Sequence, residues 1–283
     1  MILQADPIVH HPFAFDIGPL QFTGFGLAVL LGFVIAQIIA TRELERRGHD
    51  ATPMGDLVFA SVIGALIGAK LYYAILTGDP GAIFSRAGFV FWGGLIGGII
   101  VTLTVIRMKK LSIMRISDVA GIGIAAAYSV GRTGCWAVGD DYGRPWNSAL
   151  AVAFPEGAPP STAASLRQLF GLPIPADLAP STVLAVHPTQ LYETALAFGM
   201  FLILWKLRDH KHAEGWLFGV YCVLAGLERF VVEFFRAKDD RFFGVITMAQ
   251  VIAIGFILLG SAWMLARREK GAGKPGIYAE SVT

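Results

Sequence analysis

The sequence predicts an all-α, polytopic membrane protein with about seven transmembrane helices. Hydrophobic residues make up 55% of the chain and charged residues only 16%, well below the charge of a typical soluble domain. Apolar runs long enough to cross a bilayer recur along the chain, because a hydrocarbon core about 30 Å thick needs roughly 20 residues per helix. The basic residues between these runs also alternate in abundance, as they do in membrane proteins.

The apolar runs define a transmembrane helical domain over residues 1–268, followed by a polar tail at 269–283. Small residues four positions apart, such as Gly64 and Gly68, predict that the second apolar run packs closely against a neighbouring helix, because they let helix backbones approach in lipid. The expected spans are residues 22–40, 56–76, 87–106, 119–138, 191–207, 216–235 and 244–265.

The distribution of Lys and Arg predicts the orientation of the helices. The Lys and Arg residues between the spans fall into two sets, one on each side of the membrane. Cytoplasmic loops carry the excess of basic residues, so the larger, richer set places the N-terminus outside and the tail in the cytoplasm. No basic segment precedes the first apolar run, so we expect no cleaved signal peptide. The richer set comprises Arg42, Arg46, Arg47, Arg107, Lys109, Lys110, Arg115, Lys206, Arg208, Lys211, Arg267, Arg268, Lys270 and Lys274; the poorer set comprises Arg86, Arg144, Arg167, Arg236, Lys238 and Arg241.

One long outer segment, residues 139–188, separates the fourth and fifth spans. It holds more than half of the 14 prolines of the chain, which excludes a long helix. A connection of this length is either a small ordered cap or a flexible lid.

Several charged residues fall inside the expected spans, where charge is costly and usually marks function. Arg132 lies in the fourth span, Glu193 in the fifth, and Arg229, Glu233 and Arg236 in the sixth. The last three are spaced i, i+4 and i+7, so one continuous helix would present them on one face. Arginines facing a cavity suit a phosphate, although the same charges could form an ion-pair network that only joins helices.

Two further groups of residues leave alternatives open. Asp140 and Asp141 are either an acid–base pair or a solvated turn at the outer surface. Cys135 is either a nucleophile beside Arg132 or a small packing residue. Two cysteines, Cys135 and Cys222, cannot form a disulfide framework, and no metal-ligand spacing links them, so we expect no metal ion. We also expect no cofactor.

Motifs in a fixed order give the chain a resemblance to the prolipoprotein diacylglyceryl transferase family. The resemblance extends over nearly the whole sequence, and the order of the motifs is more specific than any one of them. The matching segments are Gly131-Arg132-Thr133-Gly134 continuing through Gly139 to Gly143-Arg144, His187-Pro188-Thr189-Gln190-Leu191-Tyr192-Glu193, Arg229-Phe230-Val231-Val232-Glu233-Phe234-Phe235-Arg236, Gly93-Gly94-Leu95-Ile96-Gly97, and Gln250 at the start of the last span.

The resemblance implies an enzyme of the bacterial inner membrane, with residues 139–188 as a periplasmic cap and the active site on that side. Such an enzyme transfers diacylglycerol from phosphatidylglycerol to the lipobox cysteine thiol of a prolipoprotein, and glycerol phosphate leaves. The implied partners are therefore phosphatidylglycerol, prolipoprotein signal peptides with a lipobox cysteine, and the lipid bilayer. No nucleic acid is expected.

The motif matches also imply roles for residues. Arg132 would bind the phosphatidylglycerol head group, with Arg229 as its essential partner, and Gly143 matches a position important for activity. The expected substrate-binding set is Arg132, Gly134, Gly143, Glu193, Arg229, Glu233 and Arg236.

The chain departs from the family pattern at several positions. Trp92 replaces a histidine that is the usual candidate for the base. Either Asp140, Asp141 or His187 substitutes for it, or bulk hydroxide and substrate positioning suffice. We therefore expect a catalytic set of Arg132, Arg229, Asp140 and His187. Other departures are Phe25 for a tyrosine, Cys135 and Val138 for asparagines, Asp140 for a glutamate and Lys70 for an arginine.

These departures keep a second hypothesis open, a divergent paralogue that binds phospholipid without catalysis or uses another acceptor. A transporter is a third class, since charges within a membrane can line a substrate path. The sequence has no internal repeat, which argues against a transporter.

Overall fold

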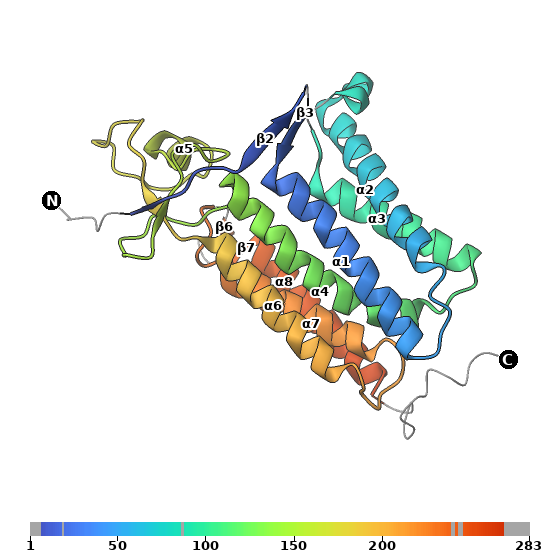
Figure 1. The fold of residues 1–283 in the computed structure, drawn as a ribbon. Coiled ribbons are helices and arrows are strands. Elements are labelled where there is room, and N and C mark those ends of the chain that lie inside the picture. The colour runs from blue at the N-terminus through green and yellow to red at the C-terminus, as the bar shows by residue number, and fades with distance from the viewer. Residues whose placement is uncertain (1–6, 19, 86–87, 239–240, 243–245, 269–283) are drawn as a thin grey trace.

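The computed structural model describes residues 7–18, 20–85, 88–238, 241–242 and 246–268. The predicted polar tail 269–283, the starts of the expected spans at 87 and 244, and Arg86, Lys270 and Lys274 of the charge analysis lie outside the described residues. Within them, seven long α-helices run side by side (Figure 1). These are α1 (Gly24–Arg46), α2 (Met54–Thr77), α3 (Phe91–Met108), α4 (Ile113–Val138), α6 (Thr189–Leu207), α7 (Trp216–Val232) and α8 (Met248–Ala266).

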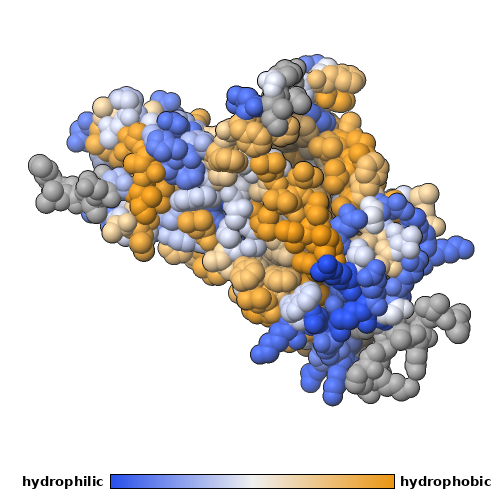
Figure 2. Space-filling model, in the orientation of Figure 1, coloured by the Kyte–Doolittle hydropathy of each residue, from blue (hydrophilic) through white to orange (hydrophobic). Residues whose placement is uncertain are grey.

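Five of these helices, α1, α2, α3, α4 and α8, are long and apolar enough to cross a membrane. Figure 2 shows hydrophobic side chains over the middle of one face, with hydrophilic side chains gathered at the lower right end. Exposed large apolar residues of this density suit lipid rather than water. The prediction of a helical polytopic membrane protein is therefore confirmed.

Helix α4 is the central helix of the bundle. Half of its apolar window is buried, against 17–22% for the other four candidate spans. Its residues Ile122 and Ala125 are fully buried in one cluster with Ala197 of α6 and Leu217 of α7. Residues of α4 therefore lie next to residues of α6 and α7, as a shared site between these helices requires.

Helices α2 and α3 pack backbone to backbone through glycine. A Cβ added at Gly68 would lie 2.9 Å from the Gly97 Cα, and one at Gly64 would lie 2.8 Å from the Val101 Cβ. No real side chain fits at such distances, so the predicted role of these glycines in helix packing agrees with the structure.

The segment 139–188 is folded and has an apolar core of its own. Strand β4 (Val152–Ala153) pairs antiparallel with β5 (Ala185–Val186) and parallel with β1 (Ile8–Val9), and helix α5 (Ala163–Gln168) packs beside them. Tyr142, Phe154 and Leu166 are among the buried residues of this core. The smaller elements elsewhere are β2 (Ala14–Ile17) with β3 (Leu20–Thr23), β6 (Arg241–Phe242) with β7 (Ile246–Thr247), and the 3-10 helix η1 (Pro80–Phe84).

Several helix boundaries differ from the sequence prediction; among them, α1 ends at Arg46 rather than 40 and α3 begins at Phe91 rather than 87. Helix α4 begins at Ile113 rather than 119, because the Ser112 side chain accepts a hydrogen bond from the Arg115 backbone N–H and caps the extra turn. Helix α7 ends at Val232, before the expected residue 235, so Glu233 is its C-terminal cap.

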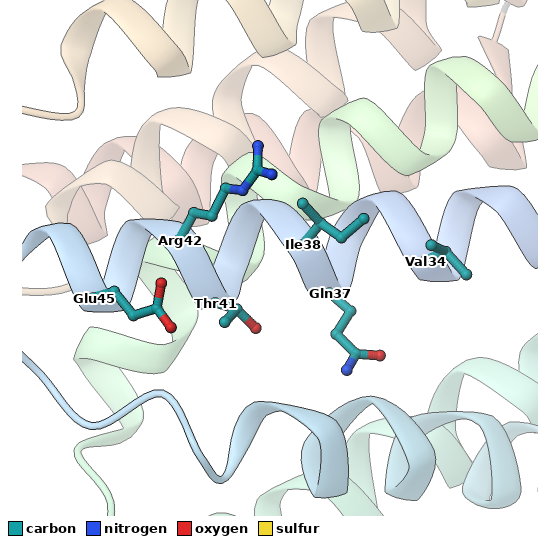
Figure 3. A pocket seen from close by; sticks show the side chains of 6 residues that line it. All are labelled: Val34, Gln37, Ile38, Thr41, Arg42 and Glu45. Carbon is teal, nitrogen blue, oxygen red and sulfur yellow. The ribbon is translucent and has the colours of Figure 1, made fainter.

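A hollow of about 410 Å³ lies along the last turns of α1, lined by Val34, Gln37, Ile38, Thr41, Arg42 and Glu45. Figure 3 shows Gln37, Thr41 and Glu45 pointing to one side of α1, while Arg42 points to the other. None of the site residues expected from the sequence lines this hollow.

Adding a methyl group between α2 and α3 should lower the stability of the protein. We expect Gly68→Ala to lower the free energy of unfolding by about 2 kcal/mol, since the new methyl group is forced against the backbone of α3. Gly199→Ala in α6 is the matched control, because a Cβ there meets nothing within 4 Å. Denaturation in detergent micelles measures both changes, and equal effects would contradict the packing role.

Candidate functional site

Backbone hydrogen bonds join three segments that are far apart in the sequence. The Gly143 N–H donates to the His187 carbonyl at 2.8 Å, and the His187 N–H donates to the Arg144 carbonyl at 3.0 Å. The Arg144 N–H donates to the Phe235 carbonyl at 2.8 Å. The start of the cap, the entry to α6 and the exit from α7 therefore form one rigid junction.

Gly143 is required at this junction for steric reasons. A Cβ there would lie 2.6 Å from the His187 Cβ and 2.9 Å from the Thr189 Cγ2. Any larger residue would separate the three segments.

Three arginines meet three carboxylates beside the junction. Arg132 of α4 donates to the Asp141 carboxylate at 2.9 Å and forms an ion pair with Glu193 of α6. Arg236 contacts Asp141 at 2.7 Å and Glu193 at 3.6 Å. Arg229 of α7 pairs with Glu233 at 2.5 Å and with Glu193 at 3.9 Å, and the Arg236 Nε lies 4.0 Å from the Glu233 carboxylate.

Glu193 is the centre of this arginine cluster, which we define as Arg132, Arg229, Arg236, Glu193, Glu233 and Asp141. It is 1% exposed and contacts all three guanidinium groups. The Tyr128 hydroxyl, one turn before Arg132 on α4, donates to Glu193 at 3.4 Å. One buried carboxylate thus joins α4, α6 and the end of α7.

Arg236 reaches the cluster by a route that the sequence did not predict. The expected continuous helical face of Arg229, Glu233 and Arg236 is wrong, because α7 ends at Val232 and a turn follows. The Arg144 Nε donates to the Arg236 carbonyl at 3.0 Å and draws this segment toward the cap. The turn nevertheless returns the Arg236 side chain to Asp141 and Glu193.

The loop that carries Asp140 and Asp141 is held by the first turn of α6. The Thr189 hydroxyl donates to the Asp141 carbonyl at 2.7 Å, and the Gln190 amide donates to the Asp140 carbonyl at 2.5 Å. Asp141 has a φ of 55°, a left-handed conformation that Asp tolerates better than most residues. Neither aspartate is part of a freely solvated turn.

The two neighbouring aspartates differ in acidity because their surroundings differ. Burial raises the pKa of Asp140 to about 6, and the charge of Asp141 adds to this effect. Burial opposes ionisation of Asp141 as well, but Arg236 and Arg132 outweigh it and lower its pKa to about 2. At neutral pH Asp141 is a fixed anion, whereas Asp140 can exchange a proton.

His187 lies in an aromatic enclosure at the junction. Its ring stacks on Trp146 with 4.3 Å between the ring centroids and meets Phe235 edge to face. Its Nδ1 lies 3.2 Å from the Tyr192 hydroxyl. Burial lowers the pKa of His187, so the imidazole is neutral at neutral pH.

The two glycines beside Arg132 have different surroundings. At Gly131 an added Cβ would meet nothing within 4 Å, so there is space there. At Gly134 a Cβ would lie 2.7 Å from the Ala28 Cβ and 3.0 Å from the Phe25 Cα, so this glycine allows α1 to pack on α4.

Three further positions compared with the family in the sequence analysis are Trp92, Lys70 and Gln250. Trp92 lies on the first turn of α3, is 45% exposed and carries no titratable group. The Lys70 ammonium donates to the Ser85 carbonyl at 2.6 Å and lies over the Phe89 ring. Gln250 completes a capping box with Thr247 at the start of α8.

The ligand atoms of Cys135, Asp140 and Asp141 lie within 4.8 Å of one another. The Arg132 Nη1 already contacts both the Cys135 sulfur, at 3.2 Å, and Asp141. A divalent cation would face this guanidinium at close range, so the donor set suits an arginine better than a metal ion.

The fold and the site together define a class, a polytopic membrane protein with an arginine–carboxylate cluster between its helices and beneath a folded cap. The comparisons with known proteins narrow this class to a family. The chain belongs to the prolipoprotein diacylglyceryl transferase family, whose family model matches residues 12–266.

The chain is similar to curated proteins named phosphatidylglycerol–prolipoprotein diacylglyceryl transferase. It is 30% identical to that of Geobacter sulfurreducens, over 92% of this chain and 97% of the relative. It is 30% identical to that of Bordetella parapertussis, over 93% and 95%, and 26% identical to that of Clostridium tetani, over 88% and 94%. These matches extend over nearly the full length of each protein, so they include the helices and the cap.

Removing the central carboxylate should destabilise the fold. We expect Glu193→Ala to cost about 3 kcal/mol or more, since it leaves buried guanidinium groups without a counter-charge. Glu156→Ala is the control, because the Glu156 side chain is 66% exposed and such pairs contribute less than about 1 kcal/mol. Unfolding in detergent micelles measures both, and a Glu193→Ala loss no larger than that of the control would refute the central role.

Proposed function

We propose that this protein transfers the diacylglyceryl group from phosphatidylglycerol to the lipobox cysteine thiol of prolipoproteins, the first step of bacterial lipoprotein maturation. The observation that carries the proposal is the convergence of Arg132, Arg229 and Arg236 on Glu193, in a chain that matches the family over residues 12–266. Three guanidinium groups at membrane depth suit the phosphate of a lipid head group.

The proposal includes a topology in the bacterial inner membrane. Helices α6 and α7 cross the bilayer together with the five more apolar helices, which makes seven spans. The N-terminus and the cap lie in the periplasm, and the active site faces that side. The concentration of Arg46, Arg47 and Arg115 at the opposite end supports a cytoplasmic location for that end.

Arg132 and Arg229 bind the phosphate of phosphatidylglycerol, with Arg236 as a third donor. Glu193 and Glu233 orient the guanidinium groups, and Gly134 and Gly143 set the positions of α4 and the junction. The thiolate sulfur attacks the terminal glyceryl carbon, the carbon–oxygen bond to the phosphate breaks, and glycerol phosphate leaves with the electron pair. Charge grows on the phosphate as this bond breaks, and the arginines stabilise it.

Asp140 accepts the proton of the incoming thiol. Burial raises the pKa of Asp140 to about 6, which keeps it ionised at neutral pH and makes it a stronger base than an ordinary aspartate. His187 is the second candidate for the base, since its imidazole is neutral at the same pH. Trp92 cannot take this role.

The second candidate function is phospholipid binding without transferase activity, as in a divergent paralogue. Trp92 favours it, because this position has no proton acceptor. Transfer to a peptide separates the two functions, whereas binding of lipid does not.

Purified protein should transfer labelled diacylglycerol from phosphatidylglycerol to a synthetic lipobox peptide. We expect Arg132→Ala to reduce the rate by about a hundredfold or more, as the loss of one donor to a developing anion does. Arg42→Ala is the control, because Arg42 is exposed on α1 at the hollow described above. A native protein that binds phosphatidylglycerol but gives no lipidated peptide would establish the second function instead.

The rate of transfer should depend on the ionisation of Asp140. Below a pH of about 6 the carboxyl group is protonated and cannot accept the thiol proton, so the rate should rise through this pH and then level off. Asp140→Asn should remove this step from the pH profile and lower the rate by about a hundredfold. If His187→Asn removes the step and Asp140→Asn does not, His187 is the base.

A further inference from the structure

The carboxylate of Asp141 binds two arginines as a phosphate would. One oxygen accepts from the Arg132 Nη1 at 2.9 Å, and the other accepts from the Arg236 Nη2 at 2.7 Å. The two free oxygens of a phosphodiester can accept from two guanidinium groups in the same way. A lipid phosphate that binds both arginines through these donors must therefore replace Asp141.

The charge of the cluster leads to the same conclusion. Arg132, Arg229 and Arg236 are balanced by Glu193, Glu233 and Asp141. Asp140 and Glu228 also interact with the arginines of the cluster, and as acidic residues they add no positive charge. A phosphodiester brought into this balanced cluster would leave an excess negative charge, which is costly at low dielectric constant. Binding is therefore easier if one of the three carboxylates leaves.

Exposure decides which carboxylate can leave. The Asp141 side chain is 42% exposed, whereas those of Glu193 and Glu233 are 2% and 1% exposed. Asp141 can exchange its arginines for water, while the two glutamates would have to cross the protein interior as unpaired charges.

The backbone does not have to move for Asp141 to leave. Thr189 and Gln190 hold the carbonyl groups of Asp141 and Asp140, so the loop is fixed from the α6 side. Rotation about the Cα–Cβ bond of Asp141 is then sufficient to release both guanidinium groups, and exposed side chains rotate rapidly.

We propose that Asp141 is a displaceable counter-ion of the lipid-phosphate site. In the empty site it holds Arg132 and Arg236 in position, and it rotates into water when the phosphate of an anionic phospholipid binds. It returns to the arginines when the phosphate product leaves. Asp141 thus weakens lipid binding and speeds release of glycerol phosphate. This role rests on the proposed function of the site.

The test is Asp141→Asn, which removes the charge and keeps a residue that tolerates the left-handed conformation. We expect the affinity for phosphatidylglycerol to rise by about tenfold, roughly the worth of one charge-assisted hydrogen bond. Native mass spectrometry of the full chain in detergent, titrated with phosphatidylglycerol and separately with phosphatidylcholine, measures the two affinities. In the transfer assay KM should fall while kcat does not rise.

Asp177→Asn is the matched control, because it removes the same charge from an exposed position in the cap and should leave both affinities unchanged. Asp141→Gly is the second variant if Asp141→Asn does not fold, since glycine adopts a φ of 55° without strain.

An unchanged or weaker affinity of the folded variant for phosphatidylglycerol would overturn the proposal, because Asp141 would then only organise the arginines. A gain that Asp177→Asn matches would also overturn it, since the effect would be one of net charge. The transfer assay on the native protein is read separately. If Asp141→Asn binds lipid more tightly but the native protein transfers nothing, the counter-ion role of Asp141 is supported and the transferase function is refuted.

Discussion

The contact between Glu193 and three arginines is the interaction on which the rest of the site depends. A guanidinium group between membrane helices is stable only with a counter-charge close by. Glu193 supplies that charge from α6 to Arg132 on α4, Arg229 on α7 and Arg236 beyond the end of α7. Each pair crosses between elements, so the same contacts that neutralise the arginines also determine how the helices pack. Tyr128 adds a neutral donor and keeps Glu193 in place.

The junction at Gly143 explains how the cap and the helices act as one unit. Its backbone hydrogen bonds to His187, and those of Arg144 to Phe235, fasten the start of the cap to the entry of α6 and the exit of α7. The same junction carries Asp140 and Asp141 to the mouth of the cluster, where Thr189 and Gln190 hold their carbonyl groups. Two neighbouring carboxyl groups thus have opposite changes in pKa, because burial raises the pKa of Asp140 whereas two guanidinium groups lower that of Asp141.

A buried ion-pair network and an anion-binding site contain the same residue types, and exposure distinguishes them. Glu233 and Glu193 are enclosed and have the properties of a structural network, whereas Asp141 is open on one side. The cluster combines both kinds of contact, with fixed carboxylates behind the arginines and one exposed carboxylate in front of them. Under the proposed function, a site of this kind is stable when empty and still presents arginines to an arriving phosphate.

The sequence by itself determined that the chain is a helical membrane protein, since the apolar runs and their length are properties of composition and spacing. It also identified Arg132, Arg229, Glu193 and Glu233, because charges within apolar runs are conspicuous without any structure. Only the tertiary structure decided that α7 ends at Val232, that Arg236 returns through a turn, and that Asp141 lies between two arginines. The physical reason is that these features depend on hydrogen bonds between segments far apart in the chain, such as Arg144 to Arg236, which local pattern does not contain. Tyr128 is intermediate, because its position one turn before Arg132 was visible in the sequence but its partner, Glu193, was not.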